Sequence, residues 1–227
     1  MVVILALISA LFLALIFGPQ LWVSATMRKH GADRPDYPGT GGELARHLLD
    51  EAGLSHVKVE RVPAGDHYAP DDQAVRLSAA NFDGRSITAV AVAAHEVGHA
   101  LQHAEGYRPL MLRQKLASWA VNINRLGAVL LVATPVLFAV TRSPVLLFGQ
   151  VAGGFAVMLT TVVIHAVTLP MEFNASFRRA LPALALVIPE DDMPAARSVL
   201  KAAAFTYVAA ALTTLLDITR WLRLLRF

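Results

Sequence analysis

The sequence predicts a mainly α-helical integral membrane protein with about four transmembrane helices and a small α+β domain. The composition favours this class, because 56% of the residues are hydrophobic and only 16% are charged, whereas soluble domains average about 25% charged residues. Long apolar runs also alternate with polar segments along the chain. The chain contains no cysteine and has a net charge of only +3. Any metal must therefore bind to His, Asp or Glu, and we expect no nucleic-acid partner.

The N-terminal segment, residues 1–27, is predicted to be a membrane anchor. Residues 2–23 carry no charge and are long enough to cross about 30 Å of hydrocarbon. No basic residue precedes the apolar run, which favours an uncleaved anchor over a signal peptide. Arg28 and Lys29 follow it, so the positive-inside rule places the next region on the cytoplasmic side.

A polar region follows the anchor and contains helix and strand patterns. Thr40 and Glu43 have the spacing of a capping box, which predicts a helix over about 41–52. Alternating apolar and polar residues predict a strand near Val57 and a second strand over 74–78. We expect the second strand to be the exposed edge that pairs with an extended peptide, because it directly precedes the next helix.

That next helix, Ser86 to about Ala104, contains an HEXXH motif with His95, Glu96 and His99. Residues four apart leave the same face of a helix, so the two imidazoles can bind one Zn²⁺. Glu96 lies beside the metal, where its carboxylate can take a proton from a water whose pKa zinc lowers to about 7. Burying such groups in an Ala/Val-rich helix without a metal would be costly. The motif therefore predicts a zinc-dependent peptidase with one catalytic zinc.

A catalytic zinc of this kind needs a third protein ligand. His103 continues the stripe, but it lies eight residues after His95, or about 12 Å along the helix axis. We expect it to lie in the second shell or at the surface. The metzincin pattern fails because Gln102 and Glu105 occupy the places of its Gly and third His.

Glu172 is the better candidate for the third ligand. Two apolar runs, 117–140 and 144–169, are predicted to form a transmembrane hairpin that returns the chain to the zinc helix. Pro170 is expected to break the second helix. Ser176 lies one turn beyond Glu172, so it can orient a ligand from the second shell.

Other polar residues near the motif have weaker assignments. His67 and Tyr68 could donate hydrogen bonds to the oxyanion of a tetrahedral intermediate, or they could be ordinary turn residues. His165 could point towards the site, although a satisfied histidine elsewhere is favoured.

The runs AVAAHEVGHALQHAEGYRPL, VTLPMEFNAS and LKAAAFTYVAAAL resemble the neutral zinc metallopeptidase family of bacterial membrane proteins (the YugP type). The EFNAS stretch is also similar to the third-ligand helix of membrane gluzincins of the heat-shock and CAAX-processing group. The resemblance implies a zincin-like domain, with His95, His99 and Glu172 as zinc ligands and Glu96 as general base. Ser176 stands where those gluzincins have Asp, which leaves its second-shell role open.

The predicted function is therefore a membrane-embedded zinc metalloendopeptidase. Its partners would be a peptide or protein substrate and the lipid bilayer. It would be a multi-pass protein of the bacterial cell membrane with a cytoplasmic catalytic domain. The alternatives are a non-catalytic, zinc-stabilised membrane scaffold and a hydrolase acting on a non-peptide amide. The expected segments are an anchor (1–27), a zincin-like catalytic region (28–115), a transmembrane hairpin (116–170), a third-ligand segment (171–201) and a C-terminal membrane helix with a basic tail (202–227).

Overall fold

The computed structural model describes residues 2–216, so the predicted basic tail lies outside the described residues. Among the described residues, the strands lie in the first half of the chain, and the second half is helical. In chain order the elements are α1 (Val2–Lys29), α2 (Gly41–Glu51), β1 (Lys58–Val62), β2 (His67–Ala69), β3 (Ala74–Ser78), α3 (Ala79–Phe82), α4 (Ile87–Ala104), α5 (Arg108–Thr141), α6 (Pro144–Phe173), the π-helix η1 (Asn174–Ala180), α7 (Leu181–Leu184), the 3₁₀ turn η2 (Glu190–Asp192) and α8 (Met193–Leu216).

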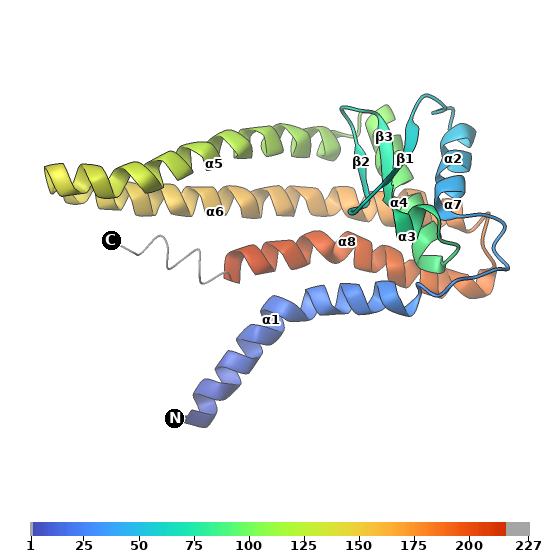
Figure 1. The fold of residues 1–227 in the computed structure, drawn as a ribbon, viewed down its shortest axis with the longest axis horizontal. Helices are drawn as coiled ribbons and strands as arrows, with labels where there is room; N and C mark the ends of the chain where they lie inside the picture. The colour runs from blue at the N-terminus through green and yellow to red at the C-terminus, as the bar shows by residue number, and fades with distance from the viewer. Residues whose placement is uncertain (1, 217–227) are drawn as a thin grey trace.

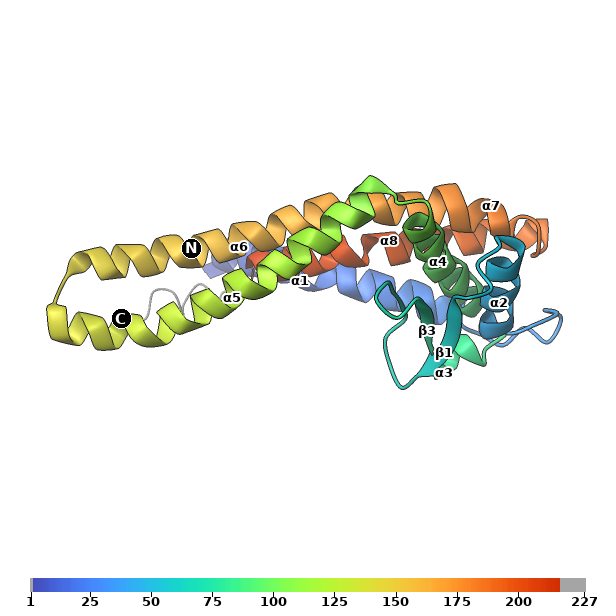
Figure 2. The same cartoon turned by 90° about the horizontal axis from the view of Figure 1, so that it is seen from above.

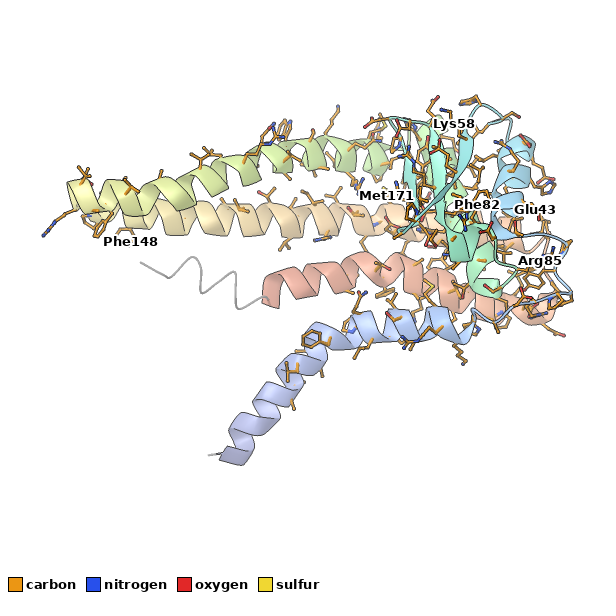
Figure 3. The ribbon with its side chains drawn as sticks, viewed as in Figure 1. Glu43, Lys58, Phe82, Arg85, Phe148 and Met171 are labelled. Carbon is orange, nitrogen blue, oxygen red and sulfur yellow. The ribbon has the colours of Figure 1, made fainter. Side chains whose placement is uncertain are left out.

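The four longest helices extend to one side of a small α/β unit. Figure 1 shows α1, α5, α6 and α8 running away from the sheet, with α2, α3, α4 and α7 gathered around it. The α5–α6 hairpin is the longest projection, as the view from above also shows (Figure 2). Phe148 lies near the far end of this hairpin, whereas Met171 lies where α6 reaches the α/β unit (Figure 3). The hairpin therefore returns the segment around residue 172 to the α/β unit that contains α4, as its sequence predicted.

The beginning of the α/β unit follows its sequence signals. Thr40 accepts a hydrogen bond from the Glu43 N–H, and the Glu43 side chain accepts one from the Thr40 N–H. This reciprocal pair satisfies two backbone donors at the start of α2. Gly53 follows the helix with φ +72°, a conformation that glycine adopts without a steric penalty. The predicted capping box and helix are both confirmed.

The sheet has the strand order β1-β3-β2. Strand β1 pairs with β3 in parallel and β2 pairs with β3 antiparallel. The prediction that the strand at 74–78 forms the edge is therefore wrong, because both of its sides are occupied. Its two neighbours are the edges, and β2 is the edge that contacts α4.

Helix α4 forms the centre of the α/β unit. Ser86 caps it by accepting a hydrogen bond from the Ala89 N–H. Nearly all of its side chains are buried, and it packs against α2, η1 and α8. The Ala- and Val-rich sequence allows these neighbours to approach closely, and the predicted helix is confirmed.

The membrane predictions are wrong. Within residues 2–216 no helix combines the length and the apolar character needed to cross a membrane. This finding overturns the predicted class of integral membrane protein, its four transmembrane helices and its multi-pass location. The apolar runs belong instead to helices that pack on one another: α5 on α6, and both α1 and α6 on α8. Part of their apolar surface, including Val23 and Ala204, is buried.

Pro170 does not end the second helix of the hairpin. Helix α6 continues through it to Phe173 and passes directly into η1. A proline removes one backbone donor from a helix, and here the helix is supported by its contacts with α5 and α8. The prediction of a break fails because tertiary packing outweighs the local signal. Glu172 consequently stands on a regular helix, which fixes its direction.

Candidate metal centre

Three predicted ligand side chains meet at the junction of α4 and α6. His95 Nε2 and His99 Nε2 lie 3.2 Å apart. Oε2 of Glu172 lies 3.1 Å from Nε2 of His95 and 3.3 Å from Nε2 of His99. All three residues are buried. Among the described residues, these three form the group of His and acidic side chains that could hold a metal ion.

This triangle has the dimensions that zinc requires. Ligands at 2.0–2.1 Å from a tetrahedral ion are separated from one another by about 3.4 Å, close to the observed spacing. Both carboxylate oxygens of Glu172 are buried without a well-aligned hydrogen bond, and the two imidazoles lie beside Oε2. A cation bound between the three groups would balance the buried charge. Two histidines and one glutamate are a common donor set of catalytic zinc sites. The donor set therefore fits a zinc ion.

The electrostatics of the cluster are strongly coupled. Burial by itself would raise the pKa of Glu172, but the two imidazoles beside it lower that pKa to about 2. Burial would lower the pKa of His99, but Glu172 and Glu96 raise it to about 9. In the metal-free protein Glu172 is thus ionised and His99 carries a proton at neutral pH. A metal ion would replace that proton as the positive charge of the cluster.

Ser176 fixes the ring of His95. The Oγ atom of Ser176 lies 3.0 Å from Nδ1 of His95 and 3.2 Å from the carbonyl oxygen of Leu200. A carbonyl can only accept, so the Ser176 hydroxyl donates to Leu200 and accepts the Nδ1–H of His95. This tautomer leaves the Nε2 lone pair of His95 directed at the metal position. A serine therefore supplies the contact that the sequence left open.

Gln102 orients the ring of His99, a role that no sequence pattern predicted. The Oε1 atom of Gln102 lies 3.0 Å from Nδ1 of His99. Its Nε2 donates to the carbonyl of Met171 and to the side-chain oxygen of Asn174, at 2.9 Å each. Both amide protons are thus used, so Oε1 accepts the Nδ1–H of His99. The only available signal was that Gln102 lies three residues after His99, close to the same face of α4.

Gly98 allows η1 to approach α4. A methyl group built at Gly98 would lie 2.9 Å from the carbonyl oxygen of Ala175 and 3.3 Å from its Cα. These are backbone atoms, so a larger residue would push the two helices apart. Arg179 on η1 also links the two helices, because it forms an ion pair with Glu105 at the end of α4. The close contact sets the separation between the histidines and Glu172.

Glu96 is held beside the metal position by the neighbouring strand. Its Oε2 accepts a 2.8 Å hydrogen bond from the backbone N–H of Tyr68 in β2. The carboxylate is buried, and this burial raises its pKa, although His95 and His99 oppose the shift. A carboxylate with a raised pKa is suited to accept and return a proton near neutral pH. Its role as general base stays a prediction.

The family of the chain follows from comparison with known proteins. Residues 3–226 match the family described as "Putative neutral zinc metallopeptidase". The chain belongs to this family. It is also 37% identical over 222 residues to a Bacillus subtilis (strain 168) protein named "Putative membrane protease YugP", covering 92% of this chain and 91% of the relative. No solved structure gives a significant match. The predicted resemblance is thus confirmed.

A cavity of about 540 Å³ opens onto the candidate site of this family member. His67, Tyr68 and Glu96 line it together with the three candidate ligands. The Tyr68 hydroxyl lies 2.8 Å from Nδ1 of His103, and His103 is absent from the ligand cluster, as expected. The proposed oxyanion role of His67 and Tyr68 stays a prediction. Arg113 also lines the cavity, although no sequence pattern predicted this position.

Proposed function

We propose that the protein is a zinc-dependent endopeptidase that hydrolyses peptide bonds in the cavity beside α4. The observation that carries this proposal is the buried triangle of His95, His99 and Glu172, with Glu96 held next to it. Membership of a family described as a zinc metallopeptidase supports the same reaction class.

Each side chain of the site has a distinct task in the proposed reaction. His95, His99 and Glu172 would hold the zinc ion, which when bound acts as a Lewis acid towards water and a peptide carbonyl. Glu96 takes a proton from the attacking water and returns it to the leaving amine. The N–H of Tyr68 fixes Oε2 of this carboxylate.

The substrate would lie along strand β2 in an extended conformation. The N–H of Tyr68 points to Glu96 and not to β3, so the outer edge of β2 borders the cavity. An edge strand offers unpaired backbone groups to an added peptide strand. Pairing there would place the peptide backbone close to the carboxylate of Glu96.

The decisive variant is Glu96→Gln, which keeps the size of the side chain but removes its basic oxygen. We expect it to bind one equivalent of zinc and to cleave a peptide library at least about 100-fold more slowly than wild type. Glu51→Gln, at an exposed position on α2, is the matched control and should retain full activity. Undiminished cleavage by Glu96→Gln would refute the role of Glu96 as general base. Zinc binding by wild type with no turnover of any peptide would favour the non-catalytic scaffold.

A further inference from the structure

One arginine in the wall of the active-site cavity is unpaired. Arg113, in the second turn of α5, lines the cavity together with the candidate zinc ligands. Its Nε atom is buried and has no hydrogen-bond partner. Within residues 2–216 it also forms no ion pair with a carboxylate. A buried N–H without an acceptor is costly unless water or a ligand accepts its hydrogen bond.

The acidic side chains that line the cavity lie against other groups. Asp66 accepts hydrogen bonds from the backbone and hydroxyl of Ser78 and from the amide of Asn81. Glu96 is held by the backbone of β2, and Glu172 by the two imidazoles. Within residues 2–216, none of these acidic side chains is paired with Arg113, so its charge is available to an anionic group of a ligand.

The charge of Arg113 acts on its surroundings. Burial lowers the pKa of His165 on α6, and the positive charge of Arg113 lowers it further. Among the residues that line the cavity, Arg113 supplies the single Lys or Arg side chain. The wall formed by α5 is thus positive, while the zinc-site wall carries Glu96 and Glu172. An anionic group of a ligand would be attracted to the wall formed by α5.

We propose that Arg113 binds a carboxylate of the peptide substrate and so determines substrate specificity. This inference rests on the proposed peptidase function. A guanidinium presents two parallel N–H groups that match the two oxygens of a carboxylate. The carboxylate could belong to the C-terminus of the peptide or to an Asp or Glu side chain near the scissile bond. Both groups are carboxylates, and the choice of test peptides distinguishes between them.

The test compares matched peptides cleaved by the zinc-loaded full-length protein. One pair differs only in a free or amidated C-terminus, and a second series has Glu or Gln at successive positions of an amidated peptide. Wild type should prefer the carboxylate version of one set by about 10- to 100-fold in kcat/KM, mainly through a lower KM. Arg113→Gln should lose this preference, because kcat/KM should fall much more for the carboxylate peptide than for its neutral partner.

Two further variants separate specificity from folding. Arg108→Gln removes a charge from an exposed position on the same helix and should keep the wild-type preference. Arg113→Lys keeps the charge but loses the planar fork, so it should retain only part of the preference. A purely structural role for Arg113 would lower activity equally for both members of a peptide pair.

A binding measurement decides the proposal even if no peptide is cleaved. Zinc-loaded Glu96→Gln should bind the carboxylate peptides at least about tenfold more tightly than their neutral partners, and adding Arg113→Gln should remove this difference. Equal binding of both peptides to Glu96→Gln, or a preference that survives Arg113→Gln, would overturn the role of Arg113. Absence of cleavage by wild type, with this binding difference intact, would refute the peptidase function alone.

Discussion

The substitution Gly98→Ala should separate the zinc ligands without touching any of them. The added methyl group would lie 2.9 Å from the carbonyl oxygen of Ala175, so α4 and η1 must move apart by roughly 0.4 Å to restore an ordinary contact. Overpacking of this kind costs about 1–3 kcal/mol, and the better helix propensity of alanine returns about 1 kcal/mol. Because Ala175 lies on the segment that carries Glu172 and Ser176, we expect much of the strain to fall on the metal site.

We expect Gly98→Ala to bind zinc about 5- to 30-fold more weakly than wild type, because a net strain of about 1–2 kcal/mol corresponds to this loss at 1.4 kcal/mol per factor of ten. Chelator competition on the purified proteins measures this difference. Gly149→Ala is the matched control, because nothing lies within 4 Å of a methyl group at that position of α6. Wild-type zinc affinity and an unchanged melting temperature in Gly98→Ala would refute the idea that this close contact sets the spacing of the ligands.

Two further predictions concern the coupling of the ligands to their surroundings. Gln102→Leu should weaken zinc binding by about 10- to 100-fold, because the Nδ1–H of His99 loses its acceptor; a variant with unchanged affinity would show that the ring is oriented by other contacts. Zinc affinity should also rise about tenfold per pH unit between pH 6.5 and 8.5. His99 has a pKa of about 9 in the metal-free protein and must lose its proton before it binds zinc. Glu172, with a pKa of about 2, is already ionised over this range and adds no further pH dependence. Chelator competition at several pH values checks this slope, and a flat profile would contradict the assigned protonation.

Local signals predicted the parts of the molecule that local chemistry determines. The spacing of His95 and His99 places two imidazoles on one helix face regardless of the fold, and the capping box of Thr40 acts within one turn. Glu172 could be found because two apolar runs joined by a short turn must return the chain to its starting side. The same logic placed Ser176 one turn further on.

Features that depend on tertiary packing could not be read from the sequence. The position of β3 in the middle of the sheet results from pairing with both neighbours, and no local pattern specifies that. Apolar runs were assigned to transmembrane helices, although part of their apolar surface packs between helices, and hydropathy alone does not specify such packing. Gln102 was read only as a mismatch to another zinc motif, and the cavity-facing position of Arg113 depends on the course of α5.

A diffraction measurement at the zinc absorption edge tests the metal site most directly. Crystals of the zinc-loaded wild-type protein should show one anomalous peak per chain, within about 2.3 Å of Nε2 of His95, Nε2 of His99 and a carboxylate oxygen of Glu172. Glu172→Ala should lose the peak or show it at much lower occupancy. A peak at any other position, or one of equal strength without Glu172, would contradict the assignment of this triangle as the catalytic zinc site.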